Sequence, residues 1–340
     1  MKILLRNIIF SMFCTLFSLS CTSKQEYSQK YVFDLDALAS DTIFYSQIAD
    51  SITYLDLDSA GTNHIQHYTD MVMSSQDIYI LDGEQKCIWN FNYDGSFKRC
   101  LNKRGHGPGE YVNLWQFEYD SINQELLVLD SKSVIHYDMD FSFLYKEELD
   151  VFATDFKLVR NYYLLSFLGG VSHESGVFLF DRNKKSSRRI ISKEENFCWN
   201  DGWEMISWGD TIAVSAPPLR NTLFHFKGVI PIDTIEIITP RSNRTYQIAD
   251  NPFQFDDYSR TIFMESTEWL FMVFWKHDTI MQNVVLNKNT GQLIKGSVLY
   301  NDVDLVDWSY GMSYSEGNAF SFIVEKDNSG GMAIQFLHLK

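Results

Sequence analysis

One short β pattern recurs after 48 residues, and this repeat restricts the possible folds more than any other feature of the chain. Residues 77–102 are DIYILDGEQKCIWNFNYDGSFKRCLN, three apolar runs separated by turn residues. Residues 125–150, ELLVLDSKSVIHYDMDFSFLYKEELD, repeat that order, and Asp130 stands 48 positions after Asp82. A four-stranded unit with a period in the forties is typical of a β-propeller blade.

Weaker copies of the unit continue to the C-terminus and end one strand short, at NAFSFIVEKD and MAIQFLHLK. An open ring would expose sheet edges, so we expect residues 51–58, SITYLDLD, to form the outer strand of the last blade. Its apolar alternation slips between Tyr54 and Leu55, which either a bulge or partial burial of both faces explains. The sequence predicts an all-β fold, a six-bladed β-propeller over residues 51–340 closed by an N-terminal strand; five or seven blades fit less well.

The N-terminus has the features of an export signal. Lys2 and Arg6 precede an apolar stretch that is too short to span a bilayer and ends in small residues. Cys21 follows as in a bacterial lipobox, although Ser18 stands where leucine is usual. We predict a lipoprotein signal peptide over residues 1–20, lipidation of Cys21, and a tether with an N-terminal extension over residues 21–50. Ordinary secretion is the alternative.

Charge and cysteine content restrict the partners. A formal net charge of −15 repels nucleic acid and anionic membrane surfaces. We therefore expect no nucleic-acid partner, membrane contact only through the lipid anchor, and a monomer. Beyond the signal and the anchor, Cys87, Cys100 and Cys198 remain, an odd number that gives no disulfide framework. A two-residue hairpin turn at Asp94-Gly95 would place Cys100 opposite Trp89 and Cys87 diagonally, so we interpret both as buried thiols.

The glycine-rich run RGHGPGEY, residues 104–111, suggests a phosphate-binding loop. Dinucleotide and P-loop motifs need a helix after the glycines, whereas YVNLWQFEYD, which follows, alternates as a strand. The spacing is GxGxG, and the proline removes one backbone donor. We predict a structural corner between two blades, with ligand contact as the alternative; the corner residues are Gly105, Gly107, Pro108, Gly109 and Glu110.

Residues 77–130 resemble NHL-type propeller repeats. The segment GHGPGEY is similar to a glycine-proline-glycine-glutamate corner in six-bladed propeller lipoproteins of Bacteroidetes, and NKNTGQL and NDVDLVD fit that group as well. The resemblance implies a six-bladed propeller in the cell envelope, either periplasmic or surface-exposed. It implies no particular reaction, because NHL domains are mostly interaction platforms and only some related propellers are lactonases or lyases.

Two aromatic groups are the candidate ligand-binding residues. They lie in NFCWNDGWEMISWGD, residues 196–210, and in VDWSYGMSY, at corresponding places in two units. Exposed rings at the mouth of the central channel would stack on sugar faces or peptide side chains, whereas packing between blades is the alternative. DNPFQFDDYSR, residues 250–260, would extend the same rim. The candidate binding residues are Trp199, Trp203, Trp208, Trp308, Tyr310 and Tyr314.

We expect a cell-envelope lipoprotein that acts as a non-enzymatic binding or scaffold propeller for a glycan, a peptide or an envelope protein. We assign no catalytic residue, no metal ligand and no cofactor. The alternative is a lactonase-like hydrolase or lyase that uses calcium on a sugar-derived substrate; a structural subunit of an outer-membrane complex is a third possibility. Six aspartates would be candidate metal ligands under that alternative, although surface or turn positions explain them better: Asp210, Asp256, Asp257, Asp302, Asp304 and Asp307.

Overall fold

The computed structural model describes residues 27–32, 42–167, 176–192, 204–215, 222–238, 258–276, 280–306, 308–316, 319–325 and 331–340. Most of the described residues are in strands, and the two helices among them are single turns, α2 (Tyr45–Ile48) and α3 (Ser59–Thr62). No helix in this part of the chain is long and apolar enough to cross a membrane.

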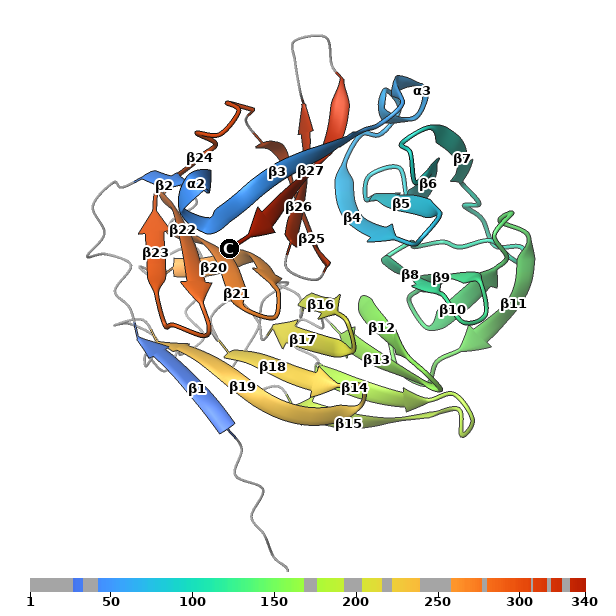
Figure 1. The fold of residues 1–340 in the computed structure, drawn as a ribbon. Coiled ribbons are helices and arrows are strands. Elements are labelled where there is room, and N and C mark those ends of the chain that lie inside the picture. The colour runs from blue at the N-terminus through green and yellow to red at the C-terminus, as the bar shows by residue number, and fades with distance from the viewer. Residues whose placement is uncertain are drawn as a thin grey trace, which may run out of the picture.

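Six sheets stand around a central axis as the blades of a propeller, which confirms the predicted fold class (Figure 1). Apart from the N-terminal strands, the strands of each blade follow chain order and are antiparallel, and the first strands adjoin one another at the centre. Blades 1 to 3 are β4 (Tyr68–Met73) to β7 (Phe97–Leu101), β8 (Gln116–Asp120) to β11 (Phe143–Glu148), and β12 (Asp155–Val159) to β15 (Ser186–Ser192).

The strands between these limits are β5 (Asp77–Asp82), β6 (Cys87–Asn92), β9 (Glu125–Asp130), β10 (Ser133–Tyr137), β13 (Tyr162–Phe167) and β14 (Gly176–Asp181). Blade 4 contains β16 (Glu204–Trp208), β17 (Thr211–Ser215), β18 (Thr222–Lys227) and β19 (Ile230–Ile238). Blade 5 contains β20 (Tyr258–Glu265), β21 (Trp269–Lys276), β22 (Ile280–Asn287) and β23 (Leu293–Gly296). Blade 6 contains β25 (Trp308–Glu316), β26 (Ala319–Glu325) and β27 (Met332–Leu339).

An N-terminal strand closes the ring, as the sequence predicts. Strand β3 (Ala49–Asp56) pairs antiparallel with β27 and is the fourth strand of blade 6. Its pairing is irregular only near Asp50, and Ile52, Tyr54 and Leu55 are all half-buried. Partial burial of both faces, rather than a bulge at the slip, therefore explains the broken alternation.

Two further strands precede β3 and lie on the outside of the ring. Strand β1 (Tyr27–Val32) pairs parallel with β19 and makes blade 4 five-stranded. Strand β2 (Thr42–Phe44) pairs parallel with β24 (Val298–Tyr300), beside blade 5. The N-terminal part of the chain thus borders blades 4, 5 and 6 in turn (Figure 1).

Apolar side chains fill all six interfaces between neighbouring blades. Leu127 and Leu129 of β9 pack with Tyr163 of blade 3, whereas Val128 packs on the other side with Tyr79 of blade 1. Both faces of a blade are buried, so its inner strands are continuous apolar runs, as in sheets covered on both sides. Fully burying each such side chain stabilises the fold by about 1.5–3 kcal/mol.

The two aspartates that mark the repeat have the same structural role. Asp82 accepts a hydrogen bond from the backbone N–H of Gln66 at 2.8 Å, and Asp130 accepts from those of Val112 and Asn113 at 3.2 and 2.9 Å. Each carboxylate ties the end of a second strand to the segment that leads into the first strand of the same blade. The spacing of 48 residues therefore reflects a repeated contact.

The first hairpin differs from its prediction in detail. Its loop is Tyr93–Asp94–Gly95, three residues instead of two, because the Asn92 N–H bonds the Ser96 carbonyl. An extra residue in β7, Lys98, then shifts the pairing back, so that Cys100 faces Trp89 as predicted. Cys87 and Cys100 are free thiols that share one apolar cluster; Cys198 lies outside the described residues.

Candidate functional site

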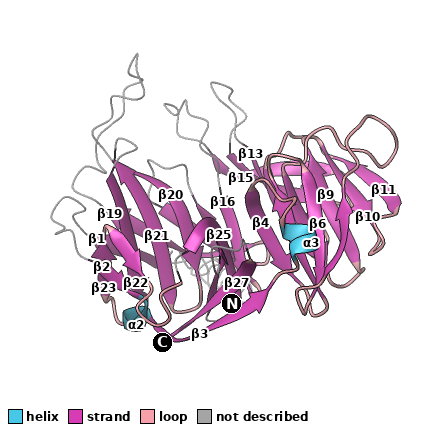
Figure 2. Cartoon of the chain, turned by 90° about the horizontal axis from the view of Figure 1, so that it is seen from above, coloured by secondary structure: helices cyan, strands magenta, loops and turns pink. Residues whose placement is uncertain are grey.

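The ring has two faces that differ in their connections. Because the strands alternate in direction, the links from one blade to the next and the turns between second and third strands lie on one face, which we call the loop face. The turns between first and second and between third and fourth strands lie on the opposite face, which we call the turn face. Figure 2 shows the blades from the side, with β3 and the C-terminus at one face.

Among the six predicted aromatic binding residues, the structure describes the side-chain surroundings of Trp208 alone. Trp199 and Trp203 lie outside the described residues, as does Cys21; Trp308, Tyr310 and Tyr314 belong to β25, the innermost strand of blade 6. Trp208 ends β16 near the turn face and is half-buried. Its ring lies 5.8 Å from that of His225 and 5.1 Å from the Lys288 ammonium, so it contacts both blade 4 and blade 5.

The glycine-rich corner is closed by its own glutamate. Gly107 donates its backbone N–H to Glu110 Oε2 at 2.8 Å, and a Cβ on Gly105 would lie 1.9 Å from the same oxygen. Gly109 has φ +72°, and its carbonyl accepts from the buried Tyr137 hydroxyl at 2.9 Å. The glycine positions that point inward are therefore filled by side chains of the fold, and Glu110 is bound within the corner.

A different aromatic group, which we name the aromatic rim, lies on the loop face between blades 2 and 3. Trp115 directly precedes β8, Phe152 lies in the link before β12, and Phe167 ends β13. The Phe152 ring lies 6.5 Å from Trp115 and 4.9 Å from Phe167. Trp115 is 39% exposed, and the Lys86 ammonium lies 5.6 Å from the centre of its ring. This group was missed in the sequence analysis because its members are 15 to 52 residues apart. The one signal that could have identified them is that each lies at or near the end of a strand.

Directly inside this rim, the first strands of blades 1 to 3 bring four charged side chains together. Asp70 comes from β4, Glu118 from β8, and Asp155 and Lys157 from β12. The Lys157 ammonium lies 2.5 Å from Glu118, and both side chains are largely buried. Asp155 accepts from the backbone N–H of Met205 in blade 4 at 2.9 Å, which extends the group to a fourth blade. We call these four side chains the channel cluster.

Burial dominates the ionisation of the channel cluster. It raises the pKa of Asp70 and Glu118 and raises that of Asp155 to about 7, although the Lys157 charge opposes the rise in each case. Burial alone would lower the pKa of Lys157, but the three carboxylates outweigh it and raise that pKa. The lysine is therefore charged at neutral pH and compensates part of the carboxylate charge.

The channel cluster is a poor cation site because Lys157 already supplies its cation. Within the described residues, no three His, Cys, Asp or Glu side chains are arranged to hold a metal ion. Of the six aspartates considered from the sequence, Asp210 is 70% exposed, Asp302 accepts from Ser46, and Asp304 accepts from Tyr54. The other three, Asp256, Asp257 and Asp307, lie outside the described residues.

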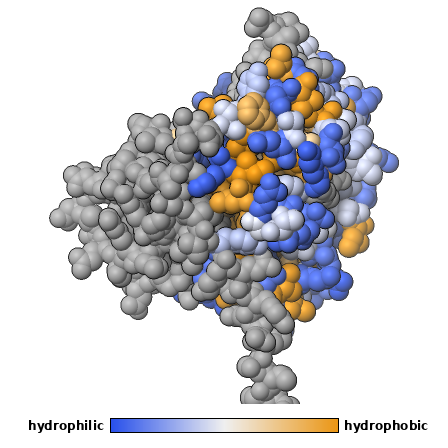
Figure 3. All heavy atoms as spheres, turned by 60° about the vertical axis from the view of Figure 1, so that its left-hand side comes forward, coloured by the Kyte–Doolittle hydropathy of each residue, from blue (hydrophilic) through white to orange (hydrophobic). Residues whose placement is uncertain are grey.

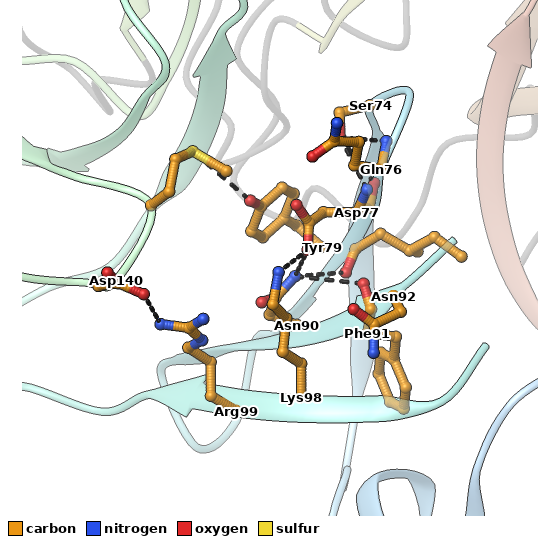
Figure 4. Close-up of polar contacts among 12 residues, drawn as sticks. Ser74, Gln76, Asp77, Tyr79, Asn90, Phe91, Asn92, Lys98, Arg99 and Asp140 are labelled. Atoms are coloured by element: carbon orange, nitrogen blue, oxygen red, sulfur yellow. Dashed lines mark hydrogen bonds and ion pairs between the residues drawn. The ribbon is translucent and has the colours of Figure 1, made fainter. Parts of the chain in front are cut away.

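A second set of buried polar groups recurs at one position of the third strand. Asn90, His136 and His225 each directly precede a bulge in blades 1, 2 and 4. Asn90 donates to Asp77 at 3.1 Å, and Lys98 pairs with the same carboxylate at 2.7 Å (Figure 4). His136 bonds Glu125 at 2.7 Å, a glutamate that starts its strand as Asp77 does.

The buried histidine of blade 4, His225, is held in its charged form by two carboxylates. His225 bonds Asp233 through Nδ1 and Glu265 of blade 5 through Nε2, the latter at 3.0 Å. Burial would lower its pKa, but the bonds to the two carboxylates raise it to about 9. Lys288 pairs with Glu265 at 2.7 Å and completes the network. These groups join neighbouring blades near the turn face, away from the aromatic rim.

Comparison with known proteins supports the fold. The model of a family described as a domain of unknown function, DUF4934, matches residues 30–330. A Bacteroides fragilis protein that is named as an exported protein has 16% identity and a TM-score of 0.67. The alignment covers 92% of this chain and 99% of that one. A member of the DUF4221 family from Bacteroides vulgatus has 10% identity and a TM-score of 0.54, over 86% and 97% of the two chains. A search of functionally characterised proteins gives no match.

Proposed function

The chain belongs to the DUF4934 family, and from that premise we propose that it is a non-enzymatic binding or scaffold propeller of the bacterial cell envelope. Its ligand on this proposal is a glycan, a peptide or an envelope protein, bound at the loop face. The protein acts as a monomer held to a membrane by a lipid on Cys21.

The aromatic rim is the observation that carries the proposal. Trp115 presents an exposed indole beside Phe152 and Phe167, on a ring whose blade interfaces are fully packed. Rigid aromatic side chains lose little conformational entropy on binding and offer flat apolar faces to sugars and peptide side chains. Loops positioned on a rigid scaffold are a common place for such contacts.

The channel cluster favours binding over metal-dependent hydrolysis. A calcium ion would need the oxygens of Asp70, Glu118 and Asp155, and Lys157 already pairs with Glu118 and attracts the other two carboxylates. The negative charge that remains beneath the rim favours ligands with a cationic or hydrogen-bond-donating group. A calcium-dependent lactonase or lyase is therefore the weaker proposal.

The location rests on the sequence. The lipobox-like cysteine follows an apolar segment with a basic start. Intact-mass analysis of the protein purified from membranes tests this point. Lipidation at Cys21 would remove the mass of residues 1–20 and add that of a diacylglyceryl group on the thiol and an acyl chain on the new amino group.

Binding is tested with a glycan array and a peptide library applied to the whole protein, followed by Trp115→Ala and Phe152→Ala. We expect either change to weaken the ligand found by about tenfold or more, as for interface hot spots. Tyr93→Ala is the matched control, because Tyr93 is 50% exposed but lies in a turn on the opposite face. Binding that is unchanged in both rim variants, or that requires added calcium and consumes the ligand, would overturn the proposal.

A further inference from the structure

The turn face carries a basic hairpin that the total charge conceals. Residues 182–189, RNKKSSRR, contain five arginines and lysines and no acidic residue, in a chain of net charge −15. They form the turn between β14 and β15 and the start of β15. Lys184 and Lys185 are 76% and 59% exposed, although Lys184 pairs with Asp181 at 3.1 Å and Lys185 pairs with Glu147. Arg188 is exposed as well. Clusters of four to eight basic residues are typical of surfaces that bind anionic lipid.

An apolar hairpin tip lies on the same face, in the neighbouring blade 4. Ile230 and Ile232 begin β19 and are 56% and 42% exposed. Val229, in the turn before them, packs in the same cluster as Ile190 and Ile191 of β15. Basic side chains beside exposed apolar side chains suit the interfacial region of a bilayer, where the charges meet headgroups and the apolar groups leave water.

The start of β1 brings the predicted anchor to the same place. Tyr27 lies beside Asp233, three residues after Ile230, and β1 runs parallel to β19 (Figure 1). The chain therefore enters β1 from the turn face. Only five residues separate Cys21 from Tyr27. Because each residue spans at most about 3.5 Å, a lipid on Cys21 would hold Tyr27 within roughly 20 Å of the membrane surface.

We propose that this part of the turn face, formed by Lys184, Lys185, Arg188, Ile230 and Ile232, docks on the anionic phospholipid surface of the membrane that holds the lipidated chain. The inference rests on the proposed anchor at Cys21. Docking fixes blade 4 toward the bilayer and leaves the loop face, with the aromatic rim, directed away from it. Salt screens charges that are more than about 10 Å apart, so the attraction between this surface and the anionic lipid depends on the charges close to it and not on the net charge of the chain.

The test uses the full lipidated chain in phosphatidylcholine vesicles with and without phosphatidylglycerol, with amide hydrogen exchange as the readout. We expect exchange in residues 182–189 and 229–232 to slow about tenfold when the anionic lipid is present. Each neutralised basic residue weakens such contacts about fivefold, so Lys184→Gln with Arg188→Gln should abolish the protection. Lys132→Gln is the control, an exposed lysine on the loop face that should change nothing.

The experiment distinguishes a failure of lipidation from a failure of docking. Intact mass and flotation on neutral vesicles report the anchor alone. Equal exchange in both lipid mixtures on a lipidated chain would overturn docking and leave the anchor intact. If the chain carries no lipid, flotation with phosphatidylglycerol vesicles decides, and binding that is absent or unaffected by the two substitutions rejects the proposal. If an anionic polysaccharide slows exchange in these residues as much as the anionic lipid does, the basic hairpin is a glycan-binding site and the proposal is rejected.

Discussion

Buried ionisable residues lie in two places of this fold, and the two environments favour opposite charge states. The channel cluster holds carboxylates whose ionised forms burial disfavours, whereas His225 is held in its charged form by Asp233 and Glu265. Both sets join residues of different blades. Their protonation therefore affects how the blades are held together as well as their local contacts.

His225 should make the protein less stable in alkaline solution. Its folded pKa of about 9 exceeds the ordinary value of 6.5, so its contribution is complete below pH 6.5 and is lost between pH 6.5 and 9. We expect the free energy of unfolding to fall by about 2–3 kcal/mol over this range, and by much less in His225→Gln. Urea unfolding at pH 6 and pH 9.5 measures this difference; His106→Gln, at an exposed position, should behave as the wild type.

Asp155 should also make the protein less stable as pH rises, but over a lower pH range and because its charged form is disfavoured. Its raised pKa of about 7 means that the folded state holds a proton more tightly than the unfolded state, so ionisation costs stability as pH rises from about 4 to 7. Asp155→Asn keeps an acceptor for the Met205 N–H and removes this cost. We expect the variant to gain about 2 kcal/mol relative to the wild type between pH 5 and pH 8. An equal loss of stability at both pH values would show that the charge is needed for pairing with Lys157.

The sequence predicts some of these residues and misses others for a physical reason. Asp82 and Asp130 could be found because each acts within its own repeat, so their spacing is visible in the chain. Asp70, Glu118 and Lys157 meet only because three innermost strands converge on one axis. No local pattern carries that information. Trp115, Phe152 and Phe167 were missed for the same reason, since ring geometry and not spacing brings them together.

The hairpin, which recurs among the blades, and the glycine-rich corner both depend on backbone geometry. In blades 1, 2 and 4 one extra residue bulges from the outer strand next to the polar third-strand position. The sequence repeat predicts the hairpins but not these bulges. In the first hairpin the loop is one residue longer than predicted and the outer strand has one extra residue, so the two differences cancel and the predicted strand pairing is unchanged. The corner at residues 104–111 is set by glycine conformations and by Glu110.

Gly109→Ala tests how strongly the corner is constrained. The residue has φ +72°, and an added Cβ would lie 2.5 Å from the Phe143 Cβ, so backbone strain and a steric clash combine. We expect a loss of about 2–4 kcal/mol in the free energy of unfolding. Gly291→Ala is the matched control, with the same φ and no atom within 4 Å, and should cost only about 1 kcal/mol. Equal losses in the two variants would mean that packing against Phe143 contributes nothing.

The whole molecule depends on three N-terminal strands of unequal importance. Strand β3 completes blade 6, and the segment before it contributes Ile43, Tyr45 and Ile48 to the apolar cluster between blades 5 and 6. Strand β1 adds a fifth strand to a blade that already has four. Figure 3 shows the outer side near β2 and β24 with apolar groups among hydrophilic ones, and Phe44, Val298 and Tyr300 are partly exposed there.

Truncation separates these roles. A chain that starts at residue 33 retains six four-stranded blades, so we expect a decrease of only a few degrees in Tm. A chain that starts at residue 59 leaves β27 as an open edge and removes part of a core cluster, so we expect loss of cooperative unfolding and aggregation. Thermal circular dichroism and size-exclusion chromatography measure both outcomes. A soluble, cooperatively folding shorter chain would show that closure by β3 is dispensable.

Closure by β3 also sets an order of events during synthesis. Residues 49–56 are made before the first blade, yet their partner, residues 332–339, is made only after blades 1 to 5. Strand β3 must therefore remain without its partner while five blades assemble behind it. Translation that stops before residue 332 leaves β3 without a partner, so the ring cannot close.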